Sequence, residues 1–428
     1  MAQHKEISFG YALMIGVNTI VGAGFLVNIY PLMKTAGMFG FLGYWCALAA
    51  FLPVIIVIAQ FAQERPVSGG IYHYAREFLS PAFGFLSGWS YFLGKSASVA
   101  LLTHALISFL ITQQTLPSTF SALTYDAICI IFLGVLNAVG VSVAGRIQWL
   151  FTTLKAIPFI AVIIGGIYFL TTWGFPTNIP MPHDFSLQAL LPLALFAFSG
   201  FEGICAIGHL IENPKKNAFR VIMTTGFVVL ALYTLLQLSI TLVLSGVCSS
   251  NSSPLLQFTD LAFGSKAVGV AIVNCAYISV LSGIFGNLAN NSWNFHALAK
   301  DGFFPFAQTL TRINKHAVPW FALIVKIIII LFFLFLTQQQ IPLQNIAVAG
   351  VTLSYLLNLL AALKGRLDNK IDQVHPLISF IGIVFCLGII GFCLSNISKH
   401  GLSLPFVALF LAGSFIATCT KRFNNSKF

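Results

Sequence analysis

The chain has 428 residues, of which 58% are hydrophobic and only 8% are charged. A soluble globular protein carries about 25% charged residues, so this composition excludes an ordinary soluble enzyme. The net charge of +11 does not indicate nucleic acid binding, because the Lys and Arg residues are scattered between apolar runs rather than clustered. The sequence therefore predicts a polytopic membrane protein that lies in a lipid bilayer and has no nucleic acid partner.

Apolar runs follow one another along the chain, and most are long enough to span a bilayer as a helix. We expect helices because backbone polar groups in lipid must be satisfied within the segment. The connections between the runs are short, so 1–428 is expected to be one transmembrane domain. The twelve runs are 9–33, 38–61, 82–113, 122–143, 147–171, 187–210, 220–247, 267–297, 318–336, 341–363, 374–396 and 402–419.

The basic residues predict the orientation of the chain. With the connections assigned alternately and the N-terminus inside, sixteen Lys and Arg residues fall inside and three, Lys34, Lys266 and Lys399, outside. Cytoplasmic connections carry the excess of Lys and Arg, so we expect both termini in the cytoplasm. The first run looks like a retained span rather than a signal peptide. Short termini without a soluble appendage favour the cell (cytoplasmic) membrane of a bacterium.

The first and sixth runs are interrupted by glycines at matching places, GVNTIVGAG over 16–24 and FAFSGFEG over 196–203. Interruptions five spans apart are typical of an inverted repeat with a substrate site at the bilayer midplane. The N–H groups at a half-helix start attract a carboxylate, and the carbonyls at the preceding half-helix end attract an ammonium. An α-amino acid carries both groups. The alternative is that the glycines serve only helix packing.

Four segments in chain order resemble motifs of the amino acid permeases of the amino acid–polyamine–organocation (APC) superfamily. They are GAGF at 22–25, RPVSGGIYHY at 65–74, FSGFE at 198–202 with ENPKK at 212–216, and ALAKDG at 297–302 followed by Pro305. The resemblance covers nearly the whole chain. It implies an all-α LeuT-like fold of about 12 helices, with helices 1 and 6 broken. The five-plus-five inverted repeat would occupy about 9–171 and 187–363, and two extra helices about 374–419.

The resemblance also implies a substrate site at the two breaks. The substrate carboxylate would rest on Gly22, Ala23 and Gly24, and the carbonyls of Ile20, Phe196 and Ser199 would hold the ammonium. Phe196 and Phe201 would be the candidates for an aromatic gate that closes over the ligand. Lys95 and Asn287 are the candidates for recognition of the substrate side chain. The other candidates for substrate binding are Ile20, Phe196, Ser199, Gly200 and Phe201.

Ionisable residues inside spans are costly and therefore functional candidates. Glu202 lies in the sixth-span break, where the family carries a glutamate implicated in gating; it could instead only stabilise the broken helix. Lys155 lies in span five, where proton-coupled relatives carry a lysine in place of a sodium ion. We expect the Lys155 ammonium near carbonyls at Val17–Ile20 and near Ser279 or Ser282. In that position it would couple transport to the proton. The alternative is that Lys155 is a fixed positive charge that never titrates.

Lys95, in span three, is the less expected charge, because the family position is usually uncharged. It would repel a cationic substrate side chain and favour a neutral or acidic one; alternatively it only pairs with Glu202. Asn287 or Asn291 in span eight would bind a polar substrate group or hydrogen-bond between helices. Lys326 is expected to snorkel towards the headgroups. His104, Asp126 and His296 have no evident partner.

The leading hypothesis is a secondary transporter of neutral or acidic amino acids by alternating access, either a proton symporter or an exchanger. The alternatives are an antiporter of cationic amino acids or polyamines, and a nutrient receptor that transports nothing. No paired carboxylates, nucleophile–His pair or Cys/His cluster appears in the sequence, so we expect no enzyme activity, no catalytic residue, no metal and no other cofactor. A homodimer is left open.

Overall fold

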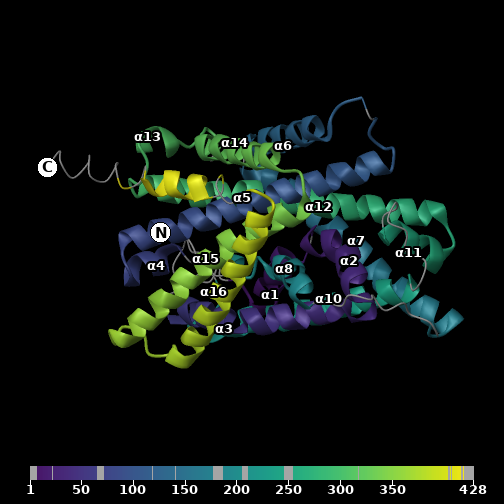
Figure 1. Ribbon diagram of the computed structural model, residues 1–428, viewed down its shortest axis with the longest axis horizontal. Helices are drawn as coiled ribbons and strands as arrows, with labels where there is room; N and C mark the ends of the chain where they lie inside the picture. The colour runs from purple at the N-terminus through teal and green to yellow at the C-terminus, as the bar shows by residue number, and fades with distance from the viewer. Residues whose placement is uncertain are drawn as a thin grey trace.

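The computed structural model describes residues 7–21, 23–64, 72–117, 119–139, 141–176, 187–204, 211–244, 254–316, 318–402, 405, 407–415 and 418. These residues form a bundle of helices (Figure 1). The β-structure in this part of the chain is an isolated bridge between Ile7 and Ile211. The expectation of an all-helical fold is confirmed for these residues.

The first half of the chain contains two half-helices followed by longer helices. They are α1 (Phe9–Ile20), α2 (Ala23–Ala36), the 3₁₀ helix η1 (Gly37–Phe41), α3 (Leu42–Glu64), α4 (Tyr72–Phe78), α5 (Pro81–Thr112), α6 (Ala122–Ala138) and α7 (Val141–Trp173). Local signals set several starts: the Ser80 hydroxyl accepts from the N–H of Phe83, and Pro81 occupies the first turn of α5, as serine caps and N-terminal prolines commonly do.

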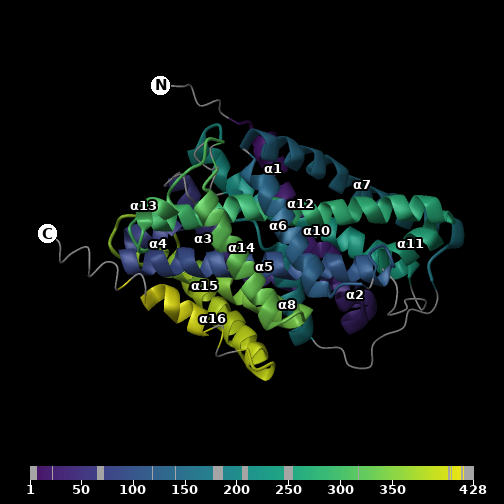
Figure 2. The same cartoon turned by 90° about the horizontal axis from the view of Figure 1, so that it is seen from above.

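The second half of the chain also consists of helices. It comprises α8 (Leu187–Phe198), α10 (Pro214–Val243), α11 (Pro254–Phe263), α12 (Lys266–Lys300), α13 (Ala307–Leu310), α14 (Trp320–Leu336), α15 (Gln340–Leu367) and α16 (Pro376–Lys399). Figure 2 shows α7 and α16 on opposite flanks of the bundle, with α5 and α12 between them.

Within the described ranges, seven helical stretches are long and apolar enough to cross a membrane, and α1, α6 and α14 are shorter apolar helices. Three short helices, α4, α11 and α13, lie in the connections between the predicted runs. These helices have only 7, 10 and 4 residues, too few for a hydropathy run to reveal.

Both expected helix breaks are present. α1 ends at Ile20, Val21 is extended with φ −71° and ψ 119°, and α2 begins at Ala23. In the second break, Gly200 follows α8 with φ +138°, a value that favours glycine. A Cβ on Gly200 would also lie 2.8 Å from the carbonyl oxygen of Thr19. Glycine is therefore needed here for the conformation and because the two breaks are in contact.

Candidate functional site

A cavity of about 760 Å³ lies where the two broken helices meet α5, α7 and α12. The backbone or side chains of both breaks contribute to its wall, and so do three charged side chains. The predicted residues that line it are Ile20, Gly24, Lys95, Lys155, Phe196, Ser199, Gly200, Glu202 and Asn287. The structure thus brings together residues that are more than 250 positions apart in the chain.

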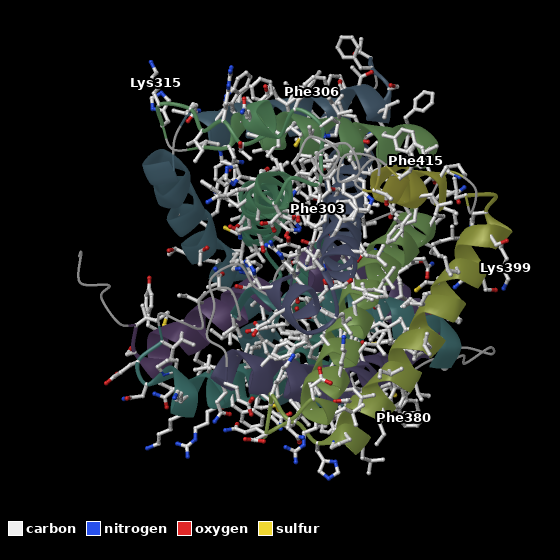
Figure 3. The ribbon with its side chains drawn as sticks, turned by 90° about the vertical axis from the view of Figure 1, so that its left-hand side faces the viewer. Phe303, Phe306, Lys315, Phe380, Lys399 and Phe415 are labelled. Carbon is white, nitrogen blue, oxygen red and sulfur yellow. The ribbon has the colours of Figure 1, made fainter. Side chains whose placement is uncertain are left out.

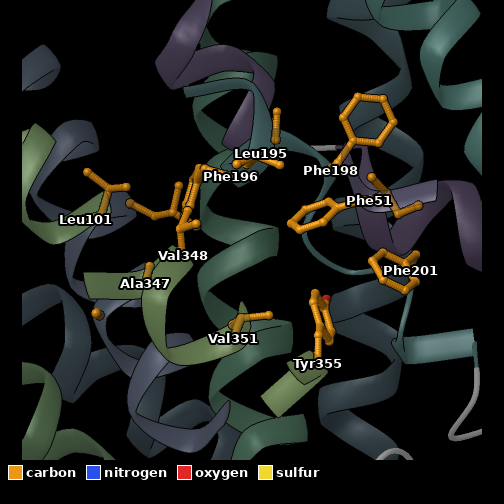
Figure 4. Packing of buried hydrophobic residues seen from close by; sticks show 14 of the residues in the cluster. Phe51, Leu101, Leu195, Phe196, Phe198, Phe201, Ala347, Val348, Val351 and Tyr355 are labelled. Atoms are coloured by element: carbon orange, nitrogen blue, oxygen red, sulfur yellow. The ribbon is translucent and has the colours of Figure 1, made fainter. Parts of the chain in front are cut away.

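Three predicted binding residues stand apart from this group. Gly22 lies outside the described residues, and Ala23 is described only as the first residue of α2. Phe201 is 1% exposed and packs 6.2 Å from Phe51 and 5.1 Å from Tyr355, centroid to centroid. Figure 4 shows Phe201 facing these two rings and not Phe196. In this conformation Phe201 is a packing residue behind the cavity wall.

The carboxylate of Glu202 is buried and fully hydrogen-bonded. Its Oε1 lies 2.8 Å from Lys95 Nζ and accepts from the Tyr91 hydroxyl at 3.0 Å. Its Oε2 accepts from the Tyr355 hydroxyl at 2.5 Å and from the Gly200 N–H at 2.9 Å. A buried charge requires such compensation. Lys95 therefore lines the cavity and forms the ion pair with Glu202 that was one of the two alternatives, while its effect on substrate selectivity stays a prediction.

Lys155 reaches from α7 to the end of α1. Its ammonium donates to the carbonyl of Asn18 at 2.6 Å and to that of Val21 at 3.0 Å. The last carbonyls of a helix have no partner within the helix and carry partial negative charge, so a cation fits here. The serines expected beside Lys155, Ser279 and Ser282, lie on α12 in the wall of the same cavity.

Two polar contacts that the sequence did not indicate connect the broken helices. The Tyr233 hydroxyl, on α10, lies 3.0 Å from the Ile20 carbonyl and 3.1 Å from the Ala197 carbonyl. Asn28 donates to the carbonyls of Gly24 at 2.7 Å and Leu193 at 3.0 Å. A polar residue in an otherwise apolar run was the available signal for both.

Two of the three carbonyls predicted to hold an ammonium, those of Phe196 and Ile20, have hydrogen-bond partners. The carbonyl of Phe196 accepts the N–H of Ser199 at 3.2 Å and its hydroxyl at 2.9 Å, and the carbonyl of Ile20 is within reach of Tyr233. An ammonium that binds at this point would take the place of a hydroxyl donor.

Lys326 is placed differently from the prediction. It is 0% exposed, and its Nζ donates to the backbone carbonyl of Asn287 and, at 2.8 Å, to Oδ1 of the same residue. The expectation of snorkelling is therefore wrong. Hydropathy gives the depth of a residue along its helix, whereas the face on which it lies decides whether a lysine stem can reach the headgroups.

The histidines and the aspartate that lacked an evident partner also have one. His104 Nδ1 lies 2.8 Å from Asp126 Oδ2, between α5 and α6, and Ser108 lies 3.2 Å from the other ring nitrogen. His296 Nε2 lies 3.2 Å from the carbonyl of Thr311. The pairing of His104 with Asp126 depends on which faces of two helices meet, which periodicity alone does not show.

One end of the cavity is bounded by α4. Tyr72 lines the cavity and hydrogen-bonds Asp301 at the end of α12, and Arg76 forms an ion pair with the same carboxylate at 2.7 Å. Burial, together with this hydrogen bond, raises the pKa of Tyr72, so its hydroxyl stays protonated as a donor at neutral pH. Asp301 belongs to the ALAKDG segment, and this contact gives that segment a structural role.

Among the described residues, no group of three or more His, Cys, Asp or Glu side chains is placed to hold a metal ion. The polar chemistry of the cavity therefore comes from helix ends, hydroxyls, amides and three charged side chains. Such a site can bind a small zwitterion through backbone groups.

Comparison with known proteins identifies the family. The family model described as "Amino acid permease" matches residues 7–419. The serine/threonine exchanger SteT of Bacillus subtilis is 22% identical over 402 residues, which cover 90% of each chain. The uncharacterized transporters Mb2022c of Mycobacterium bovis and Rv1999c of Mycobacterium tuberculosis are each 24% identical over 301 residues, 69% of this chain and 66% of theirs.

These relatives are transporters and not enzymes. The family match extends over nearly the whole chain and includes the two breaks, the cavity and the charges that line it. The chain is therefore a multi-pass membrane protein that belongs to the amino acid permease family of the APC superfamily.

Proposed function

We propose that the protein is a secondary active transporter of neutral or acidic amino acids, which works by alternating access around the two helix breaks. It couples transport to protons or exchanges one amino acid for another. The observation that carries this proposal is the cavity itself, because both breaks and the cations Lys95 and Lys155 meet in its wall. Transporter sites of this kind lie at discontinuous helices near the midplane.

Helix packing supports a five-plus-five repeat within twelve spans. In such a repeat α3 corresponds to α10, α5 to α12, α6 to α14 and α7 to α15. α3 packs on α8 as α10 packs on α1, and α5 packs on α15 as α12 packs on α7. The pairs α5–α6 and α12–α14 are related in the same way. An inverted repeat requires such matched contacts, since each half must present the same surfaces to the other.

The bound amino acid would lie with its carboxylate on the start of α2, at Gly22–Gly24, and its ammonium at the carbonyls of Ile20, Phe196 and Ser199. The helix start offers free N–H groups and a positive dipole end. Tyr233 and Asn28 hold the two breaks together, so that both half-sites keep their spacing.

The cavity extends from the breaks towards the end of the bundle that carries α4 and α13. Tyr72, Ala297 and Pro319 contribute to its wall at this end. The positive-inside count assigns these residues to the cytoplasmic side. We therefore interpret this conformation as inward-facing, with Phe25, Tyr44 and Phe198 packed around Tyr233 beyond the breaks. Both termini would be cytoplasmic.

The charges of the cavity disfavour a cationic substrate side chain. Glu202 is the only acidic residue of the described wall, and Lys95 neutralises it. Lys155 adds a positive charge whose described partners are neutral carbonyls. The name of the Bacillus relative, a serine/threonine exchanger, agrees with a neutral polar substrate. An antiporter of polyamines or cationic amino acids is less consistent with these charges.

The test is uptake of labelled amino acids into proteoliposomes that contain the purified protein. Vesicles are tested empty with an inward proton gradient, and preloaded with amino acids without one. Gradient-driven accumulation in empty vesicles establishes proton symport, and uptake only into preloaded vesicles establishes exchange. Competition by serine and glutamate, and not by lysine or arginine, is the expected selectivity. Folded protein that transports no amino acid in either arrangement would refute the proposal.

A further inference from the structure

Lys326 is a fully buried lysine with only neutral partners. It lies on α14 and is 0% exposed. Its Nζ donates to the backbone carbonyl and the side-chain oxygen of Asn287 on α12. No ion pair joins it to an acidic side chain in the part of the chain that the structure describes. Burying a lysine without an anionic partner is costly, so Lys326 does not stabilise the fold through an ion pair.

Asn287, in contrast to Lys326, lies in the cavity wall and is half-buried. Its amide has one oxygen, which accepts, and one NH₂ group, which donates. An ammonium can only donate. Lys326 therefore requires that the Asn287 amide turn its oxygen, Oδ1, towards Nζ, which lies 2.8 Å away. Asn287 is among the described residues of the cavity wall and Lys326 is not. The opposite orientation would set NH₂ against NH₃⁺.

The amide nitrogen of Asn287 consequently faces the other way. This nitrogen has no hydrogen-bond partner among the described residues. If it were buried, it would be a buried polar atom without a partner, and it is not one of those atoms. It is therefore accessible, and the space that Asn287 borders is the cavity. The wall presents a hydrogen-bond donor at this position, although the residue type alone allows either a donor or an acceptor.

We propose that Lys326 is a positioning residue that holds Asn287 as a donor and so selects substrates whose side chain carries an acceptor oxygen. The substrate class is an amino acid with a hydroxyl, ether, amide or carboxylate side chain. This inference rests on the proposed function and names the class of side chain for the same cavity.

The nearby charges fit this class. Lys95, in the cavity wall, is a second donor and is paired with Glu202. The four hydrogen bonds to Glu202 occupy the only carboxylate of the described wall. An oxygen with lone pairs is stabilised beside such groups, whereas a side chain that only donates is not.

The test compares two isosteric amino acids, O-methylserine and norvaline, in proteoliposomes with the full-length protein. Their side chains differ by one ether oxygen, which accepts but cannot donate. For the unmodified protein we expect kcat/KM for O-methylserine to be about tenfold higher, the value of one hydrogen bond. Lys326→Met should lower the ratio, because the amide is then no longer held as a donor and can also turn its oxygen towards the cavity.

Variants of Asn287 separate positioning from general structural damage. Asn287→Leu should remove the preference, and adding Lys326→Met to it should change the ratio no further, because Lys326 acts through Asn287. Asn287→Asp keeps the acceptor for Lys326 but presents an oxygen to the cavity, so the ratio should fall below one. The control is Lys399→Met, at the exposed end of α16, which should leave the ratio unchanged.

Three results would overturn the inference. The unmodified protein could transport both probes with equal kcat/KM, or Lys326→Met could lower kcat/KM for both probes by the same factor. The double variant of Lys326 and Asn287 could also show a ratio different from that of Asn287→Leu alone. If Lys326→Met does not fold, the unmodified protein and the two Asn287 variants still decide the matter. Failure of the proposed function is a different result, since neither probe would then be transported.

Discussion

At the scale of the residue, the cations of the cavity differ in what their ammonium groups contact. Lys95 contacts a carboxylate, whereas Lys155 contacts the carbonyls of Asn18 and Val21 at a helix end. The hydrogen bonds from Lys155 to these carbonyls depend on whether the lysine is protonated and on where the first break places the two carbonyls. The proposal of proton coupling therefore assigns to Lys155 the influence of the proton on the first break.

The variant Lys155→Met tests this role. It removes two charged hydrogen bonds, worth about 1.5–3 kcal/mol each, and leaves the α1 end without its cation. We expect uptake driven by a proton gradient to fall at least about tenfold, because 1.4 kcal/mol corresponds to a factor of ten. Uptake into proteoliposomes, with Lys399→Met as control, measures this. Undiminished gradient-driven uptake by Lys155→Met would show that Lys155 is not required for coupling.

The residue scale also shows which partners a sequence leaves undetermined. Lys326, His104 and Asp126 were each visible as polar residues in apolar runs, yet their contacts were not. A buried polar group must find a partner, and that rule predicts that a contact exists. It does not identify the contact, because the partner lies on another helix at a distance along the chain that no local pattern constrains.

At the scale of the element, the contact between α5 and α15 depends on two glycines. A Cβ on Gly350 would lie 2.8 Å from the Cα and the nitrogen of Gly94 and 2.8 Å from the carbonyl oxygen of Ser90. These are backbone atoms and cannot move aside as a flexible side chain would. Small residues allow helices to approach closely in membranes, and here the approach places Tyr355 of α15 against Glu202.

We expect Gly350→Ala to lower the stability of the protein by about 1–3 kcal/mol, the usual cost of overpacking. Gly391→Ala is the matched control, because this glycine lies inside α16 and a Cβ there meets nothing within 4 Å. Alanine at that position should be neutral or stabilising, since it favours helix by about 0.5–1 kcal/mol. Thermal unfolding in detergent compares the two, and equal midpoints would contradict this account of the contact.

The helix breaks show how far an element can be predicted. Glycines at matching places in the first and sixth runs located both interruptions, because an unwound segment needs residues that tolerate unusual φ. The short helices α4 and α11 were missed, since segments of 7 and 10 residues depend on packing rather than on hydropathy. α4 matters for the site, because it carries Tyr72 to the cavity.

At the scale of the whole molecule, charge is distributed unequally between the two ends of the bundle. The end with α4 and α13, on the left in Figure 1, carries Arg76, Arg312 and Lys315. Figure 3 looks onto this end, with Lys315 at its edge and Phe303 in its interior. The opposite end, near α11, carries Lys266 at the start of α12. The excess of basic residues predicts which end is cytoplasmic.

Single cysteines report this orientation. In a background without reactive native cysteines, Lys315→Cys should react with a membrane-impermeant maleimide in inside-out vesicles and not in intact cells. Lys266→Cys should show the reverse pattern, because the two residues lie at opposite ends of the bundle. Labelling of Lys315→Cys from outside the cell would invert the orientation and make this conformation outward-facing.

The sequence by itself determined the class of the molecule, the helix breaks and the charged residues of the site. Hydropathy, glycine and charge are local properties, and the free energy of placing a residue in lipid depends on that residue and its neighbours. Only the tertiary structure decided that Lys95 neutralises Glu202, that Phe201 packs behind the wall, and that Lys326 turns the Asn287 amide. These contacts join helices far apart in the chain, and only the packing of helix faces brings such residues together.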